Sequence, residues 1–226
     1  DIQPHNGGFL LRVPNRQNPV ELEPEVKQEK LLNVYREHLN FLKISRLDNV
    51  GDLNRAIRED RVYEVIQVAE AYQSMQINDI AKEISKRFND GVKVVFISGP
   101  SSSGKTTFRK RLEVQLMVNL LKPVGISLDD YFVNRDNTPL DENGEKDYES
   151  LYALDLELFE DHMLKLMSGE TVELPTYNFV TGKREYRGNF LKMDNNSILI
   201  IEGIHGLNPK LTEHIPEDMK FKIYVS

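Results

Sequence analysis

The sequence predicts an α/β fold: a parallel sheet with helices on both faces, preceded by a smaller, mainly helical N-terminal segment. Beyond residue 90, short apolar runs alternate with a longer amphipathic stretch, as strands and helices do in such a sheet. Hydrophobicity in these runs is continuous rather than alternating, which is typical of strands covered on both faces. Before residue 90, apolar residues recur mostly at helical spacing. We therefore expect an accessory domain over 1–90 and the sheet domain over 91–226.

The N-terminal segment is predicted to contain one strand and three helices. An apolar run between Gly8 and Pro14 predicts the strand, over 9–13. Asn78 or Asp79 is suited to begin the last helix, because a short polar side chain can accept hydrogen bonds from the first free N–H groups of a helix. The predicted helices run from Glu25 through Leu42, over 62–75, and from 78 or 79 to 88, with a loop at 49–54.

The second segment is predicted to begin as a βαβ unit. The run Val92 to Ser98 is rich in β-branched residues, and an amphipathic stretch over 108–121 follows it. The next apolar run, over 124–128, completes the unit. Two further strands are predicted over 198–201 and 221–225.

Composition excludes several classes of protein. Residues 1–90 carry 13 basic and 15 acidic side chains and residues 91–226 carry 16 and 21, so neither segment is basic, which argues against a general nucleic-acid binder. The absence of cysteine excludes disulfides and thiolate metal sites. No apolar run approaches about 20 residues and no signal-peptide pattern is present, so we predict a cytoplasmic protein without a membrane partner.

A phosphate-binding loop is the clearest functional motif. The stretch Gly99-Pro-Ser-Ser-Ser-Gly-Lys-Thr106 lies between a predicted strand and a predicted helix, which is the context that the motif requires. Backbone N–H groups and the helix N-terminus would bind the phosphates of a nucleoside triphosphate, Lys105 would reach the β- and γ-phosphates, and the Thr106 hydroxyl would bind Mg²⁺. The predicted sheet is thus of the P-loop NTPase type. The alternative is a Gly/Ser-rich turn that matches by accident.

The candidate nucleotide-binding residues of this loop are Gly99, Ser101, Ser102, Ser103, Gly104, Lys105, Thr106 and Thr107.

Three acidic residues follow predicted strands, at the sheet edge where ligands gather in open α/β folds. Asp129 and Asp130 come after the strand over 124–128, and a carboxylate there can accept the proton of a hydroxyl that attacks the γ-phosphate. Their alternative is a solvated turn. Glu202 follows the strand over 198–201 and can hold Mg²⁺, or equally serve as a structural cap.

A predicted hairpin over 174–187 carries Tyr177 and Phe179 on one face, followed by a turn and a basic cluster. The two rings could hold a flat substrate, and Lys183, Arg184 or Arg187 could meet negative charge. Equally, the rings could pack into the domain. The five histidines show no metal-ligand spacing, so we assign them no chemistry.

Four motifs together resemble the uridine kinase and phosphoribulokinase family in order and spacing: the phosphate loop, Ser127-Leu-Asp-Asp-Tyr-Phe132, Pro175-Thr-Tyr-Asn-Phe179 and Ile200-Ile-Glu-Gly-Ile204. The resemblance covers about residues 92–226. It implies a phosphate-loop kinase that uses ATP or GTP with Mg²⁺, with Asp129 as the base and Lys105 as the second catalytic residue. It also implies that Glu202 and Thr106 hold Mg²⁺, and that Tyr177 and Phe179 contact a nucleoside base.

Departures from the family pattern bear on the acceptor. The uridine kinases usually carry His at the position of Gly182 and Asp at that of Asn178, and their ribose-binding Asp is matched only by Glu149. We keep Glu149 and Arg184 as candidate substrate-binding residues. The family also places an Arg-bearing lid after the strand that matches 221–226, so this chain is expected to lack the lid and to turn over poorly.

Residues 1–90 resemble the tail of an accessory domain shared with threonyl-tRNA synthetases that precedes some bacterial uridine kinase homologues. The stretches Gly8-Phe-Leu-Leu-Arg-Val-Pro14 and Asp52-Leu-Asn54 carry this resemblance. The sequence begins without methionine, so we expect it to be part of a longer chain. A homo-oligomer is left open.

Three functions remain open at this point. The first is ATP-dependent phosphorylation of a uridine- or cytidine-like nucleoside. The second keeps the kinase but changes the acceptor to another small alcohol or a sugar phosphate, in line with Gly182 and Asn178. The third is a non-catalytic ATP-binding switch.

Overall fold

The protein is described by a computed structural model that covers residues 2–5, 8–16, 18–22 and 29–226. The chain forms two compact units, residues 1–69 and residues 70–226, and their boundary lies inside the long helix α3 (Val62–Asn89). Among the residues described, no helix combines the length and the apolar character needed to cross a membrane.

The sheet of the second unit has four strands in the order β4-β7-β3-β8. All three neighbouring pairs are parallel, which confirms the predicted α/β class. Each strand lies within two residues of its predicted bounds. They are β3 (Val94–Ser98), β4 (Lys122–Ser127), β7 (Ser197–Glu202) and β8 (Lys220–Tyr224).

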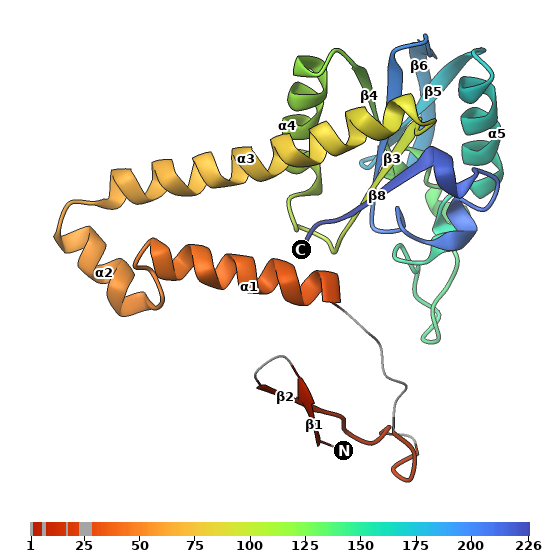
Figure 1. Cartoon of the computed structure of the whole chain (residues 1–226). Helices are drawn as coiled ribbons and strands as arrows, with labels where there is room; N and C mark the ends of the chain where they lie inside the picture. The colour runs from red at the N-terminus through yellow and green to blue at the C-terminus, as the bar shows by residue number, and fades with distance from the viewer. Residues whose placement is uncertain (1, 6–7, 17, 23–28) are drawn as a thin grey trace. The chain divides into compact units, whose positions relative to one another are not determined.

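Successive side chains of a strand point to opposite faces of the sheet, and a buried cluster covers each face. On β3, Val94 and Phe96 belong to one buried cluster, and Val95 and Ile97 belong to the other. The first cluster is shared with α5 (Leu156–Met167), and the second with the C-terminal part of α3 and with α4 (Lys105–Val118). Figure 1 shows α4 and α5 on opposite sides of the strands. The predicted arrangement of helices on both faces is therefore confirmed.

The long helix corrects one prediction. The sequence predicts two helices, with a break before Asn78 or Asp79, but α3 continues through both residues. No glycine or proline interrupts 62–89, and the buried Ile77, Ala81 and Ile84 keep helical spacing across the expected break. A residue suited to capping begins a helix only where the apolar pattern also begins.

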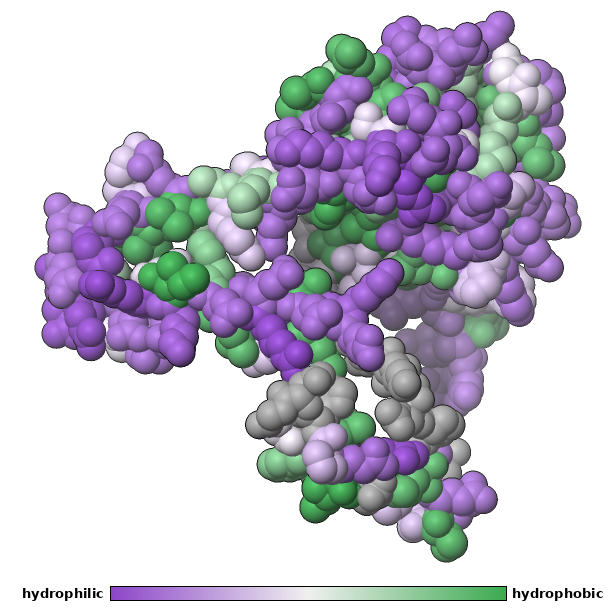
Figure 2. All heavy atoms as spheres, in the orientation of Figure 1, coloured by the Kyte–Doolittle hydropathy of each residue, from purple (hydrophilic) through white to green (hydrophobic). Residues whose placement is uncertain are grey.

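The first unit contains a small hairpin and helices. Strands β1 (Ile2–His5) and β2 (Gly8–Leu11) pair antiparallel. Helix α1 spans Glu29–Ile44, and its predicted start at Glu25 lies outside the described residues. Many apolar residues of this helical segment are exposed, among them Leu31, Val34 and Ile44. Figure 2 shows apolar residues at its visible surface.

The loop predicted at 49–54 is wrong, because helix α2 spans Val50–Arg58. Asn49 caps this helix: its Oδ1 accepts a hydrogen bond from the Asp52 N–H at 3.1 Å. The cluster of polar residues that suggested a loop is thus the first turn of a helix.

The remaining elements are a two-stranded hairpin, which contacts α5 and η1, and a set of short 3₁₀ turns. A hairpin of β5 (Thr171–Asn178) and β6 (Lys183–Lys192) confirms the hairpin predicted over 174–187. Short 3₁₀ turns complete the chain: η1 (Leu128–Tyr131), η2 (Arg135–Asn137), η3 (Leu151–Ala153), η4 (Pro209–Leu211) and η5 (Glu217–Met219).

Candidate active site

The loop between β3 and α4 has the geometry of a phosphate-binding loop. Gly104 has φ of 86° and lies directly before the first residue of α4, so a side chain there would be strained. Gly99 is needed for a different reason, since a Cβ at this position would overlap the carbonyl oxygen of Val225. The loop thus passes close to β8 and delivers its backbone to the N-terminus of a 14-residue helix, where N–H groups and the helix dipole favour anions.

A cleft of about 370 Å³ lies over this loop. It brings together most of the predicted nucleotide-binding residues with the two acidic residues predicted for chemistry. The lining residues are Ser101, Ser102, Gly104, Lys105, Thr106, Thr107, Ser127, Asp129, Glu202, Gly203 and Ile204. Gly99 and Ser103 do not line the cleft, and the hydroxyl oxygen of Ser103 is buried.

Lys105 lies along the loop. Its Nζ donates hydrogen bonds to the carbonyl oxygens of Gly99 (3.0 Å) and Pro100 (2.7 Å). The ammonium is therefore held at the wall of the cleft, on the side where phosphates would meet the loop. A lysine in this position can exchange carbonyl partners for phosphate oxygens without a large movement.

Asp129 enters the cleft from η1, which directly follows β4. Its backbone N–H donates to the hydroxyl oxygen of Ser127 at 3.3 Å, which caps the turn. Although the residue is exposed as a whole, the cleft partly desolvates its carboxyl group. Burial and the nearby charge of Glu202 raise the pKa of Asp129, while the charge of Lys105 partly offsets them. A raised pKa suits a carboxylate that must accept a proton.

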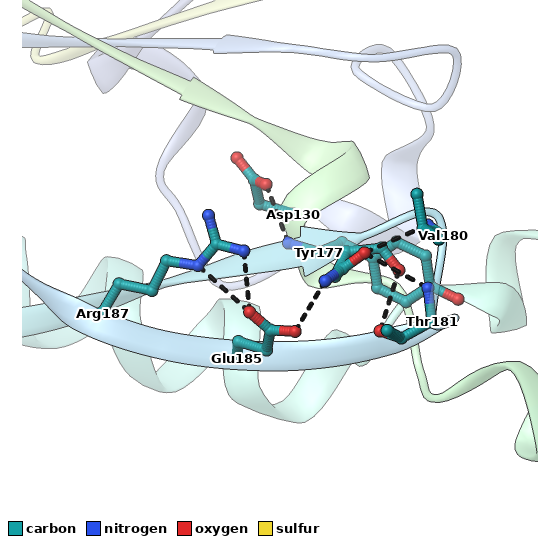
Figure 3. A network of polar contacts seen from close by, with 7 residues as sticks. Asp130, Tyr177, Val180, Thr181, Glu185 and Arg187 are labelled. Carbon is teal, nitrogen blue, oxygen red and sulfur yellow. Dashed lines mark hydrogen bonds and ion pairs between the residues drawn. The ribbon is translucent and has the colours of Figure 1, made fainter.

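Asp130 has a different environment from its neighbour. Its Oδ1 accepts a hydrogen bond from the Tyr177 N–H of β5 at 3.1 Å, so Asp130 fastens the hairpin to η1 (Figure 3). Burial raises the pKa of Asp130 and this hydrogen bond opposes the rise. Position after the strand did not separate the two acids, and the family resemblance favoured Asp129. In the structure, Asp130 binds the hairpin and Asp129 lines the cleft.

Glu202 ends β7 and is 5% exposed. Its Oε1 accepts a hydrogen bond from Arg109 Nε of α4 at 2.9 Å, whereas its Oε2 is buried and has no hydrogen-bond partner. In the described part of the chain, three buried side-chain atoms lack a partner: Ser103 Oγ, Glu202 Oε2 and His205 Nε2. Ser103 belongs to the phosphate loop, Glu202 ends β7 and His205 follows three residues later; of the three residues, Glu202 lines the cleft.

The donor atoms of the cleft fit Mg²⁺. The hydroxyl of Thr106 and the carboxylates of Asp129 and Glu202 are hard oxygen donors, and all three residues line the cleft. Oε2 of Glu202 is also buried without a hydrogen-bond partner. The described residues contain no group of three His, Cys, Asp or Glu that could hold a metal alone. Such sparse protein ligation is typical of Mg²⁺, which keeps several waters and binds substrate phosphates.

Three aromatic rings meet at the tip of the hairpin. The centroids of Tyr177 and Phe179 are 5.1 Å apart, and the ring of Phe132 lies 5.5 Å from Tyr177 and 6.5 Å from Phe179. Tyr177 is 6% exposed and Phe179 is 59% exposed. Tyr177 therefore packs into the domain, whereas the ring of Phe179 is exposed. The sequence reasoning missed Phe132, although it lies within the quoted motif over 127–132.

Neither these two hairpin rings nor the other predicted substrate-binding residues line the cleft. Arg184 Nη1 donates to Asp155 Oδ2 at 2.8 Å. Arg187 pairs with Glu185, as Figure 3 shows. Glu149 is exposed, and its backbone N–H donates to Asp147 Oδ1 at 3.0 Å. The roles given to Arg184 and Glu149 stay predictions.

Residues 94–226, more than half of the chain, match the model of the phosphoribulokinase / uridine kinase family. The chain belongs to this family. Its fold is that of a phosphate-loop kinase. A solved structure titled as a possible uridine kinase from Bacillus stearothermophilus shares this fold, with a TM-score of 0.50 and 23% identity over 66% of this chain and 80% of that one.

Curated relatives within the family differ in name and length. Uridine kinase from Macrococcus caseolyticus is 28% identical over 135 residues, which are 58% of this chain and 61% of the relative. Uridine-cytidine kinase C from Dictyostelium discoideum is 30% identical over 130 residues, which are 58% of this chain and 27% of the relative. The Arabidopsis thaliana protein named inorganic pyrophosphatase TTM2 is 35% identical over 58% of this chain and 18% of its own length. The chain thus spans less than two thirds of these relatives.

Proposed function

We propose that this family member transfers the γ-phosphate of ATP to a hydroxyl group of a nucleoside resembling uridine or cytidine. One observation carries the proposal: Lys105, Asp129 and Glu202 line one cleft at the N-terminus of α4. The family membership supports the kinase reaction, and the relatives named uridine kinase support the acceptor.

Each side chain has a definite task in this reaction. The loop amides and Lys105 hold the β- and γ-phosphates, and the Thr106 hydroxyl with the Glu202 carboxylate would hold Mg²⁺. When bound, Mg²⁺ neutralises the charge that develops on the phosphates. GTP could replace ATP as donor, because every contact proposed here is made to phosphate.

Asp129 acts as the base. Its carboxylate accepts the proton of the acceptor hydroxyl while the hydroxyl oxygen forms a bond to the γ-phosphorus. The bond from the γ-phosphorus to the bridging oxygen breaks, and ADP leaves. The products are ADP, a phosphate monoester and the protonated Asp129, which then releases its proton to solvent.

Phe179 is proposed to stack on the base of the nucleoside. The exposed ring lies at the tip of the hairpin that Asp130 binds. Asp130 and Asp129 are neighbours in η1, so the hairpin is connected to the turn that carries the base. Tyr177 and Phe132 support the ring edge-on.

A second acceptor class is favoured by the hairpin tip. Gly182 has φ of 67°, and a Cβ at this position would come within 2.7 Å of Arg135 Cβ and Nε. Arg135 Nη2 in turn donates to the Phe179 carbonyl oxygen at 2.6 Å. A guanidinium bonded to the backbone of the hairpin tip suits a small alcohol that carries a negative charge, such as a sugar phosphate.

The test is an acceptor screen that measures ATP consumption and the phosphorylated product across nucleosides, sugar phosphates and small alcohols. We expect acceptor-dependent formation of a nucleoside monophosphate. Phosphorylation of a sugar phosphate or another alcohol alone would replace the nucleoside proposal by the second one. Tight ATP binding with no acceptor-dependent ADP release would contradict both and favour an ATP-binding switch.

A further inference from the structure

Arg109 connects the helix after the phosphate loop to the last residue of β7. It lies on α4, one turn beyond Lys105. Its Nε donates to Glu202 Oε1 at 2.9 Å, and its Nη1 donates to Glu113 on the following turn. The side chains of Arg109 and Glu202 are only 17% and 6% exposed. An ion pair shielded to this degree fixes both partners more firmly than an exposed pair does.

Gly125 of β4 leaves room for the guanidinium. A Cβ at this position would overlap Arg109 Nη1 and Glu113 Oε1. Gly125 lies opposite Ile200 on the neighbouring strand β7, two residues before Glu202. A single missing side chain on β4 therefore lets Arg109 reach Glu202 from α4.

The three charged side chains of this cluster, Arg109, Glu113 and Glu202, carry a net negative charge, which favours a cation nearby. Arg109 supplies one positive charge, and Glu113 and Glu202 supply two negative charges, so the three side chains sum to −1. A guanidinium keeps its positive charge in proteins, and this one donates hydrogen bonds to the carboxylates of Glu202 and Glu113. Arg109 thus stays charged and occupies Oε1 of Glu202. Glu202 lines the cleft, and its Oε2 is buried without a hydrogen-bond partner.

We propose that Arg109 is a positioning residue: it binds Oε1 of Glu202 so that Oε2 is presented to the divalent cation that accompanies the nucleotide. The inference rests on the proposed function, because it takes Glu202 as a ligand of that cation. Arg109 itself touches neither substrate nor metal. Groups that orient a metal ligand from behind typically change metal affinity by about 10- to 100-fold when they are lost.

Two effects of Arg109 oppose each other, and they can be separated. As a hydrogen-bond donor it orients Glu202, which favours the cation; as a positive charge it repels the cation. Arg109→Ala removes both effects at once. Arg109→Lys keeps the charge and loses the planar fork that reaches two carboxylates. Gly125→Ala keeps every charged group and displaces the guanidinium.

The experiment measures by titration calorimetry how much Mg²⁺ strengthens ATP binding. The dissociation constant of ATP is determined in Mg²⁺ and again in EDTA for the whole chain. The value in EDTA divided by the value in Mg²⁺ is then compared between variants. The matched control is Arg111→Ala, since Arg111 lies on the same helix but pairs with Glu70 and Gln73 instead of Glu202. Thermal melting of each variant establishes that it is folded.

We expect Gly125→Ala and Arg109→Lys to lower this ratio by about tenfold, with ATP binding in EDTA and the Arg111→Ala ratio unchanged. An unchanged ratio in both charge-conserving variants would overturn the inference, as would a rise in Arg109→Ala with no change in the other two. If the wild-type chain binds ATP equally in Mg²⁺ and EDTA, the metal role of Glu202 fails together with the inference. The experiment measures ATP binding and not phosphate transfer, so its result can be interpreted even if the acceptor is not a nucleoside.

Discussion

The two neighbouring acids at the end of β4 show how one residue can be distinguished from the next. Asp130 is occupied by the backbone of the hairpin, and Asp129 lines the cleft beside Lys105. Only Asp129 therefore has a carboxylate that is available to an incoming hydroxyl. Its protonation state should control the reaction.

The pH profile of phosphate transfer should report this carboxylate. Burial and Glu202 raise the pKa of Asp129 above its ordinary value of 3.8, and the base must be unprotonated, so kcat should fall as pH falls through the raised pKa. Bound ATP adds negative charge and should raise the pKa further. The measurement is kcat against pH for the wild-type chain. A rate that stays flat down to pH 3.8 would count against Asp129 as the base.

Single residues were predictable where their position in a strand decides their place. Asp129 and Glu202 were found because the carboxyl ends of parallel strands meet at one edge. Arg109 was missed, because its partner is 93 positions away and only the packing of α4 on the sheet brings the two together. The spacing of Lys105, Arg109 and Glu113 on successive turns of one helix was the available signal.

At the scale of elements, several contacts hold the hairpin, among them hydrogen bonds to Arg135 and Asp155, and one hydrogen bond reaches the turn that carries Asp129. Apart from the packing of Tyr177, the hydrogen bond from the Tyr177 N–H to Asp130 ties β5 to the turn that carries Asp129. A hydrogen bond to a charged group contributes about 1.5–3 kcal/mol. This bond should matter for the acceptor and little for the nucleotide.

Asp130→Ala should therefore raise KM for the acceptor by about tenfold, since 1.4 kcal/mol corresponds to a factor of ten. The dissociation constant of ATP should change little, because Asp130 does not line the cleft. Steady-state kinetics in the acceptor and calorimetry with ATP measure the two quantities. An equal loss of ATP binding would show that Asp130 supports the phosphate loop rather than the hairpin.

Elements were predicted well where apolar patterning is strong and poorly where polar residues served as signals. The four strands of the sheet lie within two residues of the predicted apolar runs, and β3 and β7 are buried along their whole length. In contrast, Asn49 begins α2 where a loop was predicted, and Asn78 lies inside α3 where a helix start was predicted. Asparagine favours turns and helix starts alike, so its residue type cannot decide between them.

At the scale of the whole molecule, the two compact units do not coincide with the predicted domains. The predicted boundary near residue 90 follows α3, whereas the units divide at residues 69 and 70, inside α3. Ile77, Ala81 and Ile84 of α3 belong to the buried cluster on the α4 face of the sheet. The last turns of α3 therefore complete the core of the kinase fold. The likeness of the first unit to a threonyl-tRNA-synthetase accessory domain stays a prediction, as does a cytoplasmic location.

Two shortened chains would test this division. The segment 70–226 should melt cooperatively and bind ATP like the whole chain, because it keeps both buried clusters. The segment 91–226 should melt at a lower temperature, since it loses the buried Ile77, Ala81 and Ile84, of which each isoleucine is worth about 1.5–3 kcal/mol. Calorimetric melting measures both. Equal stability of the two segments would show that α3 is not part of the fold's core.

The central claim is that the cleft transfers phosphate with Asp129 as its base. The most direct measurement follows the γ-phosphate of ATP onto the acceptor for the wild-type chain and for Asp129→Asn, with ATP affinity determined for both. The account predicts that kcat falls by about 10²- to 10⁴-fold in Asp129→Asn while ATP affinity is retained. Phosphate transfer at the wild-type rate in that variant would contradict it.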